Sequence, residues 1–147
     1  MNTDLMFSSK TDDWATPQDF FDSLNAEFGF TLDAAADDSN HKCDIYFTKK
    51  ENGLSKKWGG ATWCNPPYGR EIGLWVKKAY QESRAGNLVV MLIPARTDTA
   101  WFHEYVLNKA EIRFVRGRLK FGGAKNAAPF PSMVCIFRPG ADAKCLI

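Results

Sequence analysis

The stretch that most constrains the fold is NLVVMLIPA, at residues 87–95. Its Val, Leu, Met and Ile residues follow one another without polar interruption, whereas a strand with one face in water alternates polar and apolar residues. A strand that is apolar on both faces must be covered on both sides, as in a parallel sheet. The run therefore predicts a buried strand at the centre of a sheet.

The segments around this run alternate between strand-like and helix-like patterns. A helix is predicted to start with Thr16 as its cap and Pro17 at its first position, and to end at Gly29. Further helices are predicted at 72–86 and 101–106, and further strands at 28–36 (ending at Asp33), 45–47, 60–64, 111–117 and 132–139. This order predicts an α/β sheet with helices on its faces.

Length and composition favour one globular domain. The chain has 147 residues, of which 45% are hydrophobic, enough for a sizeable core. We expect a polar, flexible segment at 1–13 and a single domain at 14–147. No run of 18 apolar residues occurs, and the first residues lack the basic and apolar regions of a secretion signal, so a cytoplasmic protein without a membrane span is expected.

The cysteines and the distribution of charge indicate which kinds of site and partner to expect. The four cysteines are far apart and form no C-x-x-C pair, so reduced thiols and no metal site are expected. Residues 1–40 hold nine acids and one Lys, and residues 41–147 hold 18 basic residues and eight acids. This asymmetry is consistent with a polyanionic partner, but also with a solubilising acidic leader on an ordinary basic domain.

A rigid turn follows the predicted strand at 60–64. It consists of Asn65, Pro66, Pro67 and Tyr68. In open α/β sheets ligands bind beyond the carboxyl ends of strands, where Asn65 and Asp33 are both expected. The Asn65 side-chain oxygen and the Pro66 carbonyl can accept hydrogen bonds from a planar amino group, and Tyr68 can stack on it.

Such acceptors make an amino nitrogen more nucleophilic, so the motif suits methyl transfer to a nitrogen attached to an sp² carbon. A sulfonium methyl, as in S-adenosylmethionine, would be the electrophile. Adenine N6, cytosine N4, an RNA base and a glutamine amide all fit this chemistry. The turn can also be one that merely leaves a strand, because Asn and Pro are common turn residues.

The chain resembles the phage-encoded DNA N6-adenine methyltransferases, the phage Dam-type family. The resemblance runs from Trp14 to Arg138 and is carried by WATPQDFFDSL, FGFTLDAAA, YFTKKENGLSKKWGGATWCNPPYG, VVMLIPARTDTAWFH and RFVRGRLKFGG with APFPSMVCIF. It implies a compact Rossmann-like class I methyltransferase fold, with a mostly parallel sheet and a late antiparallel strand. It also implies S-adenosylmethionine as methyl donor, no metal, and a flipped-out adenine of double-stranded DNA as acceptor, in a bacterial host cell.

The resemblance assigns the Asn-Pro-Pro-Tyr turn to catalysis and a second set of residues to the cofactor. The cofactor set is Trp14, Thr16, Pro17, Asp33, Ala34, Tyr46 and Asn65. From the residues alone, Asp33 can equally stabilise a local turn. Tyr46 and Phe47 could form a wall of the pocket for the cofactor's adenine, or be ordinary core aromatics. The chain departs from the family pattern in two places: alanines replace a glycine-rich turn after Asp33, and Asn52 stands where an acid is expected, with Glu51 as a substitute.

The basic segment at 113–132 is the predicted DNA contact. Arg116, Arg118 and Lys120 alternate and would share one face of an extended segment, with Phe121 bracing a flipped base and Arg96 as a further contact. The alternative is a solvated face with a mobile loop. A homodimer is an option, and a nucleic-acid-binding module that kept the fold but lost catalysis is the alternative to an enzyme.

Overall fold

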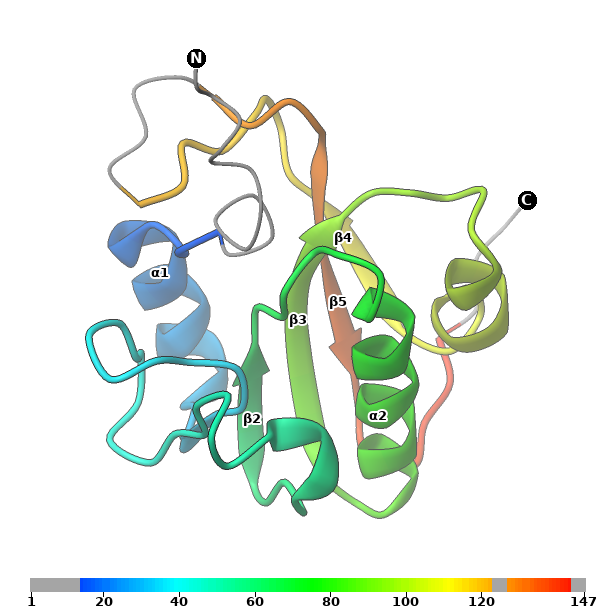
Figure 1. The fold of residues 1–147 in the computed structure, drawn as a ribbon. Helices are drawn as coiled ribbons and strands as arrows, with labels where there is room; N and C mark the ends of the chain where they lie inside the picture. Colours follow the sequence, from blue (N-terminus) through cyan, green and yellow to red (C-terminus); the bar gives the residue numbers. More distant parts are fainter. Residues whose placement is uncertain (1–13, 123–126, 144–147) are drawn as a thin grey trace.

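The computed structural model describes residues 14–122 and 127–143, so the predicted flexible segment at 1–13 lies outside the described residues. The elements are α1 (Gln18–Phe28), β1 (Leu32–Asp33), η3 (Gly53–Ser55), β2 (Ala61–Cys64), α2 (Ile72–Arg84), β3 (Leu88–Pro94), η4 (Phe102–Val106), β4 (Glu111–Phe114) and β5 (Ser132–Phe137). The strands form one sheet in the order β1-β2-β3-β5-β4, with α1 and α2 on either side of it (Figure 1). Among these residues, no helix is long and apolar enough to cross a membrane.

The direction of the strands confirms the predicted sheet. β1, β2 and β3 pair in parallel, whereas β5 pairs antiparallel with both β3 and β4. β5 is therefore the one strand of this sheet that runs against the others, and it is also the last along the chain. Because β1, β2 and β3 are parallel, their carboxyl ends meet at the same edge of the sheet.

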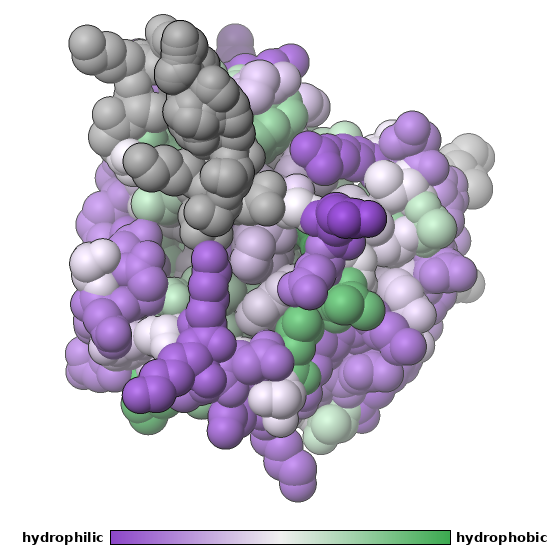
Figure 2. Space-filling view, viewed as in Figure 1, coloured by the Kyte–Doolittle hydropathy of each residue, from purple (hydrophilic) through white to green (hydrophobic). Residues whose placement is uncertain are grey.

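The apolar run forms the centre of the core, as predicted. Residues Val89 to Ile93 of β3 are fully buried, and β3 pairs with β5 from Val89–Phe137 to Pro94–Ser132. The face of the molecule drawn in Figure 2 is mainly hydrophilic, with hydrophobic side chains only in small separate patches. The apolar side chains are thus concentrated inside, around β3.

The bounds of several strands and helices differ from those predicted. β1 is only two residues long because the chain turns at Asp33, whose carboxylate accepts a hydrogen bond from the Ala35 amide. The predicted strand at 45–47 is reduced to a single bridge between Tyr46 and Asp33. The predicted helix at 101–106 is only the short π-helical segment η4.

The prediction for the start of α1 was wrong. Pro17, not Thr16, occupies the N-cap position, and no side chain caps the helix. The Thr16 hydroxyl instead accepts a hydrogen bond from Asn65. The prediction for its end is confirmed, because Gly29 adopts the left-handed conformation (φ 65°) that Gly tolerates best.

Candidate functional site

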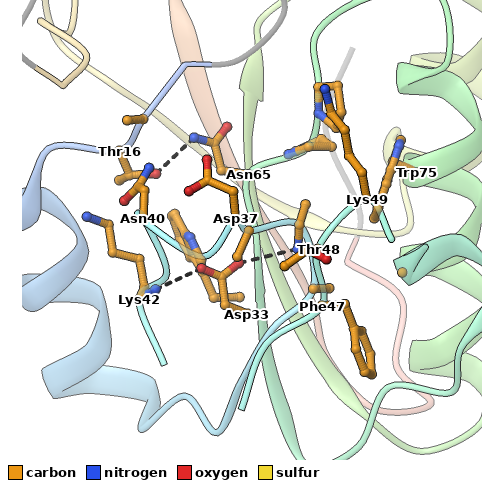
Figure 3. Close-up of a pocket in the computed structure, with 18 of the residues that line it drawn as sticks. Thr16, Asp33, Asp37, Asn40, Lys42, Phe47, Thr48, Lys49, Asn65 and Trp75 are labelled. Atoms are coloured by element: carbon orange, nitrogen blue, oxygen red, sulfur yellow. Dashed lines mark hydrogen bonds between the residues drawn. The ribbon is translucent and has the colours of Figure 1, made fainter. Parts of the chain in front are cut away.

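A cavity of about 710 Å³ lies at the carboxyl ends of β1 and β2. Ligand sites commonly have volumes of roughly 300–1,000 Å³. Four parts of the chain line it: the segment before α1, the loop that follows β1, the end of β2 with the turn that follows it, and the start of α2. Figure 3 shows these side chains converging from both sides of the sheet edge.

The position of Asn65 is fixed by the segment before α1. Its Nδ2 donates hydrogen bonds to the Trp14 carbonyl and, at 2.9 Å, to the Thr16 hydroxyl. A carbonyl oxygen can only accept, so the amide nitrogen must face Trp14 and the amide oxygen must face away. That oxygen, Oδ1, is buried and has no hydrogen-bond partner among the described residues.

The other residues of the turn lie in two places: the prolines at the cavity and Tyr68 in the core. Pro66 and Pro67 line the cavity. Tyr68 is buried; its hydroxyl donates to the Leu92 carbonyl at 2.9 Å, and its ring meets the edge of Phe130. Burial raises the pKa of Tyr68 well above its usual value. The structure therefore places Tyr68 behind the cavity, and stacking of its ring on a base stays a prediction.

Asp33 organises the loop that follows β1. Its two carboxylate oxygens accept hydrogen bonds from the backbone amides of Ala35 (3.3 Å) and Lys42 (2.9 Å). Burial raises the pKa of Asp33, although the two amides oppose this effect. Asp33 thus stabilises a local turn and also lines the cavity; each oxygen keeps a second lone pair for a ligand.

The remaining cofactor predictions fall in different places. Trp14, Thr16 and Ala34 line the cavity, but Pro17 lies in a separate shallow groove with Lys120. Tyr46 does not line the cavity. Its ring stacks on His41 at 3.9 Å and its hydroxyl donates to Asp38 at 3.0 Å. The next residue, Phe47, lines the cavity instead, because successive side chains of an extended segment point to opposite sides.

The second departure from the family pattern, Asn52 in place of an acid, lies at the cavity. Asn52 lines the cavity and adopts a left-handed conformation (φ 61°), which Asn tolerates better than most residues. Glu51 turns away: its carboxylate accepts hydrogen bonds at 2.7 Å from both the amide and the hydroxyl of Thr48. These bonds lower the pKa of Glu51. Asn52, and not Glu51, is therefore the residue of this pair at the cavity.

Many of the polar residues that line the cavity were not predicted from the sequence. Those with ionisable side chains are Asp37, Asp38, Lys42, Lys49, Lys50 and Glu71. Most come from the polar stretch after β1, whose density of charged residues beside a strand end was the available signal. Trp75 of α2 also lines the cavity, although its spacing in the sequence indicated only a core position.

The predicted DNA contacts are only partly at the surface. Arg96, Arg116, Arg118 and Lys120 are exposed, but Phe121 is buried in an aromatic cluster against Trp14. The extended face expected for 116–120 does not form, because β4 ends at Phe114 and the chain bends at Gly117, which has a φ of 73°. Phe121 would have to leave this cluster to touch DNA.

Comparisons with known proteins agree on one family. The family model described as DNA N-6-adenine-methyltransferase (Dam) matches residues 4–146. A DNA N-6-adenine-methyltransferase of Escherichia phage T1 is 38% identical over 109 residues, which cover 72% of this chain and 45% of that protein. The protein of the same name from Haemophilus phage HP1 is 31% identical over 142 residues, covering 90% of this chain and 82% of that protein. The matched region thus spans less than half of the T1 relative's length.

Proposed function

The chain belongs to the DNA N-6-adenine-methyltransferase (Dam) family, and we propose that it transfers a methyl group from S-adenosylmethionine to N6 of an adenine in double-stranded DNA. The names of the phage relatives support this acceptor. The mixed α/β fold, with its late antiparallel strand, is consistent with a Rossmann-like methyltransferase. A phage enzyme of this kind would act in the cytoplasm of the bacterial host.

The observation that carries the proposal is the orientation of Asn65. Its buried Oδ1 has no hydrogen-bond partner among the described residues, and leaving a buried acceptor unpaired costs about 1–3 kcal/mol. The exocyclic amino group of adenine offers two N–H donors of the kind this oxygen needs. A fixed acceptor in a buried site favours the tetrahedral form of the nitrogen, in which its lone pair is free to react.

The residues around Asn65 suit the rest of the reaction. The Pro66 carbonyl is the proposed second acceptor for the amino group, since the prolines are rigid and have no competing N–H. The proposed stacking residue is Tyr68. Asn65 is not basic, so the proton that N6 loses on methylation leaves to water. An adenine within the duplex cannot reach such a cavity, so the base must flip out of the stack, and Arg96, Arg116, Arg118 and Lys120 are the proposed phosphate contacts.

The cavity also fits the proposed cofactor. S-adenosylmethionine, when bound, supplies a methyl group on a positively charged sulfur. The cavity is large enough for it and lined by both carboxylates and lysines, as a ligand with a carboxylate, an ammonium and a sulfonium group requires. Asp33 is the proposed partner of the ammonium group, with Trp14, Thr16 and Ala34 around it. The alanines after Asp33 permit close approach of a ligand to the backbone, although they lack the conformational freedom of glycine.

The test is to incubate the purified protein with labelled S-adenosylmethionine and unmethylated duplex DNA, beside Asn65→Ala. Nucleosides are then identified by mass spectrometry. We expect N6-methyladenine from the parent protein, and about 10²–10³-fold less from Asn65→Ala, as for the loss of one preorganised group in other active sites. Calorimetry of cofactor binding by both proteins shows whether the loss lies in methyl transfer or in binding, since Asn65 is also a predicted cofactor contact.

Other results would replace the proposal. A methylated cytosine would mean that the enzyme acts on cytosine N4 and not on adenine N6. Methylation of RNA or protein alone would mean that DNA is not the acceptor. An absence of cofactor binding in the parent protein would favour a non-catalytic nucleic-acid-binding module.

A further inference from the structure

Trp75, which lines the cavity, carries a buried polar atom that has no hydrogen-bond partner among the described residues. Three buried side-chain nitrogen or oxygen atoms have no hydrogen-bond partner among the described residues, and two of them, Asn65 Oδ1 and Trp75 Nε1, belong to residues that line the cavity. Trp75 is only 7% exposed. Buried donors are almost always paired in folded proteins, so this one requires an explanation.

Packing prevents the Trp75 ring from turning toward another acceptor. Its six-membered ring faces Gly53 so closely that a Cβ added there would lie 3.1 Å from two of the ring carbons. On the same side it stacks on Trp58, with ring centres 6.2 Å apart and planes 25° apart. The indole nitrogen lies in the other, five-membered ring. Figure 3 shows the side chain on the α2 side of the cavity, away from Thr16.

The neighbouring tryptophan provides a direct contrast. The Nε1 of Trp58 donates a hydrogen bond of 2.9 Å to the Gly53 carbonyl. The two stacked indoles therefore share one environment, but only the one at the cavity lacks a partner. A partner that arrives with the ligand accounts for this difference.

We infer that Trp75 is a cofactor-binding residue, whose indole N–H donates a hydrogen bond to an acceptor of the methyl donor. This inference rests on the proposed function. The cofactor is favoured over the target base because Gly53, which contacts Trp75, also lies against the Ala34 carbonyl at the end of β1. The acceptor would be an oxygen or a ring nitrogen, since the indole N–H is a donor only.

The test compares Trp75→Phe with Trp58→Phe, using S-adenosylhomocysteine as the probe in calorimetry. Trp75→Phe should bind about tenfold more weakly, the usual effect of losing one hydrogen bond. It should unfold somewhat earlier than the parent protein, because the smaller ring leaves space in the core. Trp58→Phe should unfold earlier, because the Gly53 carbonyl loses its donor, and should bind more nearly as the parent does. Equal affinity of Trp75→Phe and the parent protein would overturn the inference.

A measurement on the unmodified protein covers the case in which Trp75→Phe does not fold. The five tryptophans give separate indole N–H signals in ¹⁵N spectra, which can be assigned through bonds. On addition of S-adenosylhomocysteine the Trp75 signal should shift and its proton should exchange more slowly with water. A Trp75 signal that stays in place when the probe binds would overturn the inference alone, whereas failure of the parent protein to bind the probe would overturn the proposed function as well.

Discussion

The β3–β5 half of the sheet and the β1–β2 half are built differently. β3 and β5 pair over six residues each, and all side chains from Val89 to Ile93 are fully buried. β1 pairs with β2 over only two residues, and the chain then leaves the sheet for a long polar loop. β3 and β5 are long and pair along nearly their whole length, whereas β1 ends after two residues.

Two of the three buried polar atoms that have no hydrogen-bond partner among the described residues belong to residues at the cavity, and the third, Ser132 Oγ, lies in β5. Asn65 and Trp75, which carry unpaired buried atoms, both line the cavity beside the short strands. Ligand sites commonly sit where a rigid framework ends and loops begin. The β3–β5 half therefore contributes most of the buried apolar core, while the cavity at the ends of β1 and β2 brings polar groups to a ligand, so substitutions in the core and at the cavity should separate stability from binding.

The largest expected effect on stability is that of Ile136→Ala in β5. Ile136 is fully buried and pairs with Val90, so its truncation should lower the free energy of unfolding by about 3 kcal/mol, through lost burial and a cavity. Urea unfolding measures this change, and Ile136→Val should cost about 1 kcal/mol. Binding of S-adenosylhomocysteine to the folded protein should be unchanged. A smaller loss from Ile136→Ala than from Leu54→Ala, in the half-buried loop, would contradict the comparison.

A smaller loss is expected from Gly53→Ala in the other half, together with a loss of binding. An added Cβ would lie 2.3 Å from the Ala34 carbonyl oxygen and 3.1 Å from the Trp75 ring, so the backbone must shift, at a cost of about 2 kcal/mol. Because both neighbours line the cavity, affinity for S-adenosylhomocysteine should fall as well. The matched control is Gly59→Ala, where nothing lies within 4 Å. Equal behaviour of the two variants would show that the close approach has no consequence.

Thr16→Val should affect the rate more than the stability. The substitution keeps the shape but removes the hydroxyl that accepts from Asn65 Nδ2, which leaves the amide held by the Trp14 carbonyl alone. The methylation rate at saturating cofactor should fall about tenfold, corresponding to one lost hydrogen bond. Thr16→Ser should restore it, because Ser keeps the acceptor. A Thr16→Ser variant as slow as Thr16→Val would mean that the methyl group, and not the hydroxyl, matters.

The sequence predicted the regular half of the molecule better than the half that carries the cavity. The apolar run at 87–95 and the spacing in α2 were sufficient because burial of local patterns decides them. The position of Asn65 after β2 followed in the same way. The path of the loop at 34–59 depends on Asp33 binding backbone amides up to nine residues away, which no local pattern encodes.

The surroundings of single residues could not be predicted from the sequence for the same reason. Thr16 is a good helix cap by propensity, but its hydroxyl accepts a hydrogen bond from Asn65, which lies 49 positions away in the sequence. The packing of Tyr68 against Phe121 and Phe130 could not be predicted either, and stacking of its ring on a base stays a prediction. The spacing of Trp75 predicts a core residue, which it is; only the tertiary structure shows that its N–H has no acceptor among the described residues. Each outcome depends on contacts distant in sequence.

The smallest effect is expected far from the cavity, at an ion pair that joins α1 to β4. Both carboxylate oxygens of Glu27 accept from the Arg113 guanidinium, at 2.7 and 2.8 Å, and this bonding lowers the pKa of Glu27 below its ordinary value of 4.5. A carboxyl with a lowered folded-state pKa stabilises the protein above its unfolded-state value, and this contribution is lost as the pH falls through the folded-state pKa. Glu27→Gln should therefore lower the unfolding temperature slightly at pH 7.

The pH and salt dependence separate this ion pair from a packing effect. The difference between Glu27→Gln and the parent protein should disappear in acid, where Glu27 is protonated in both states, and should shrink at high salt because exposed ion pairs are screened. Thermal unfolding at several pH values and salt concentrations measures both. A difference that is the same at every pH and salt concentration would mean that Glu27 acts through packing. A difference as large as that of Ile136→Ala would mean that the stability of the protein is not concentrated in the β3–β5 half.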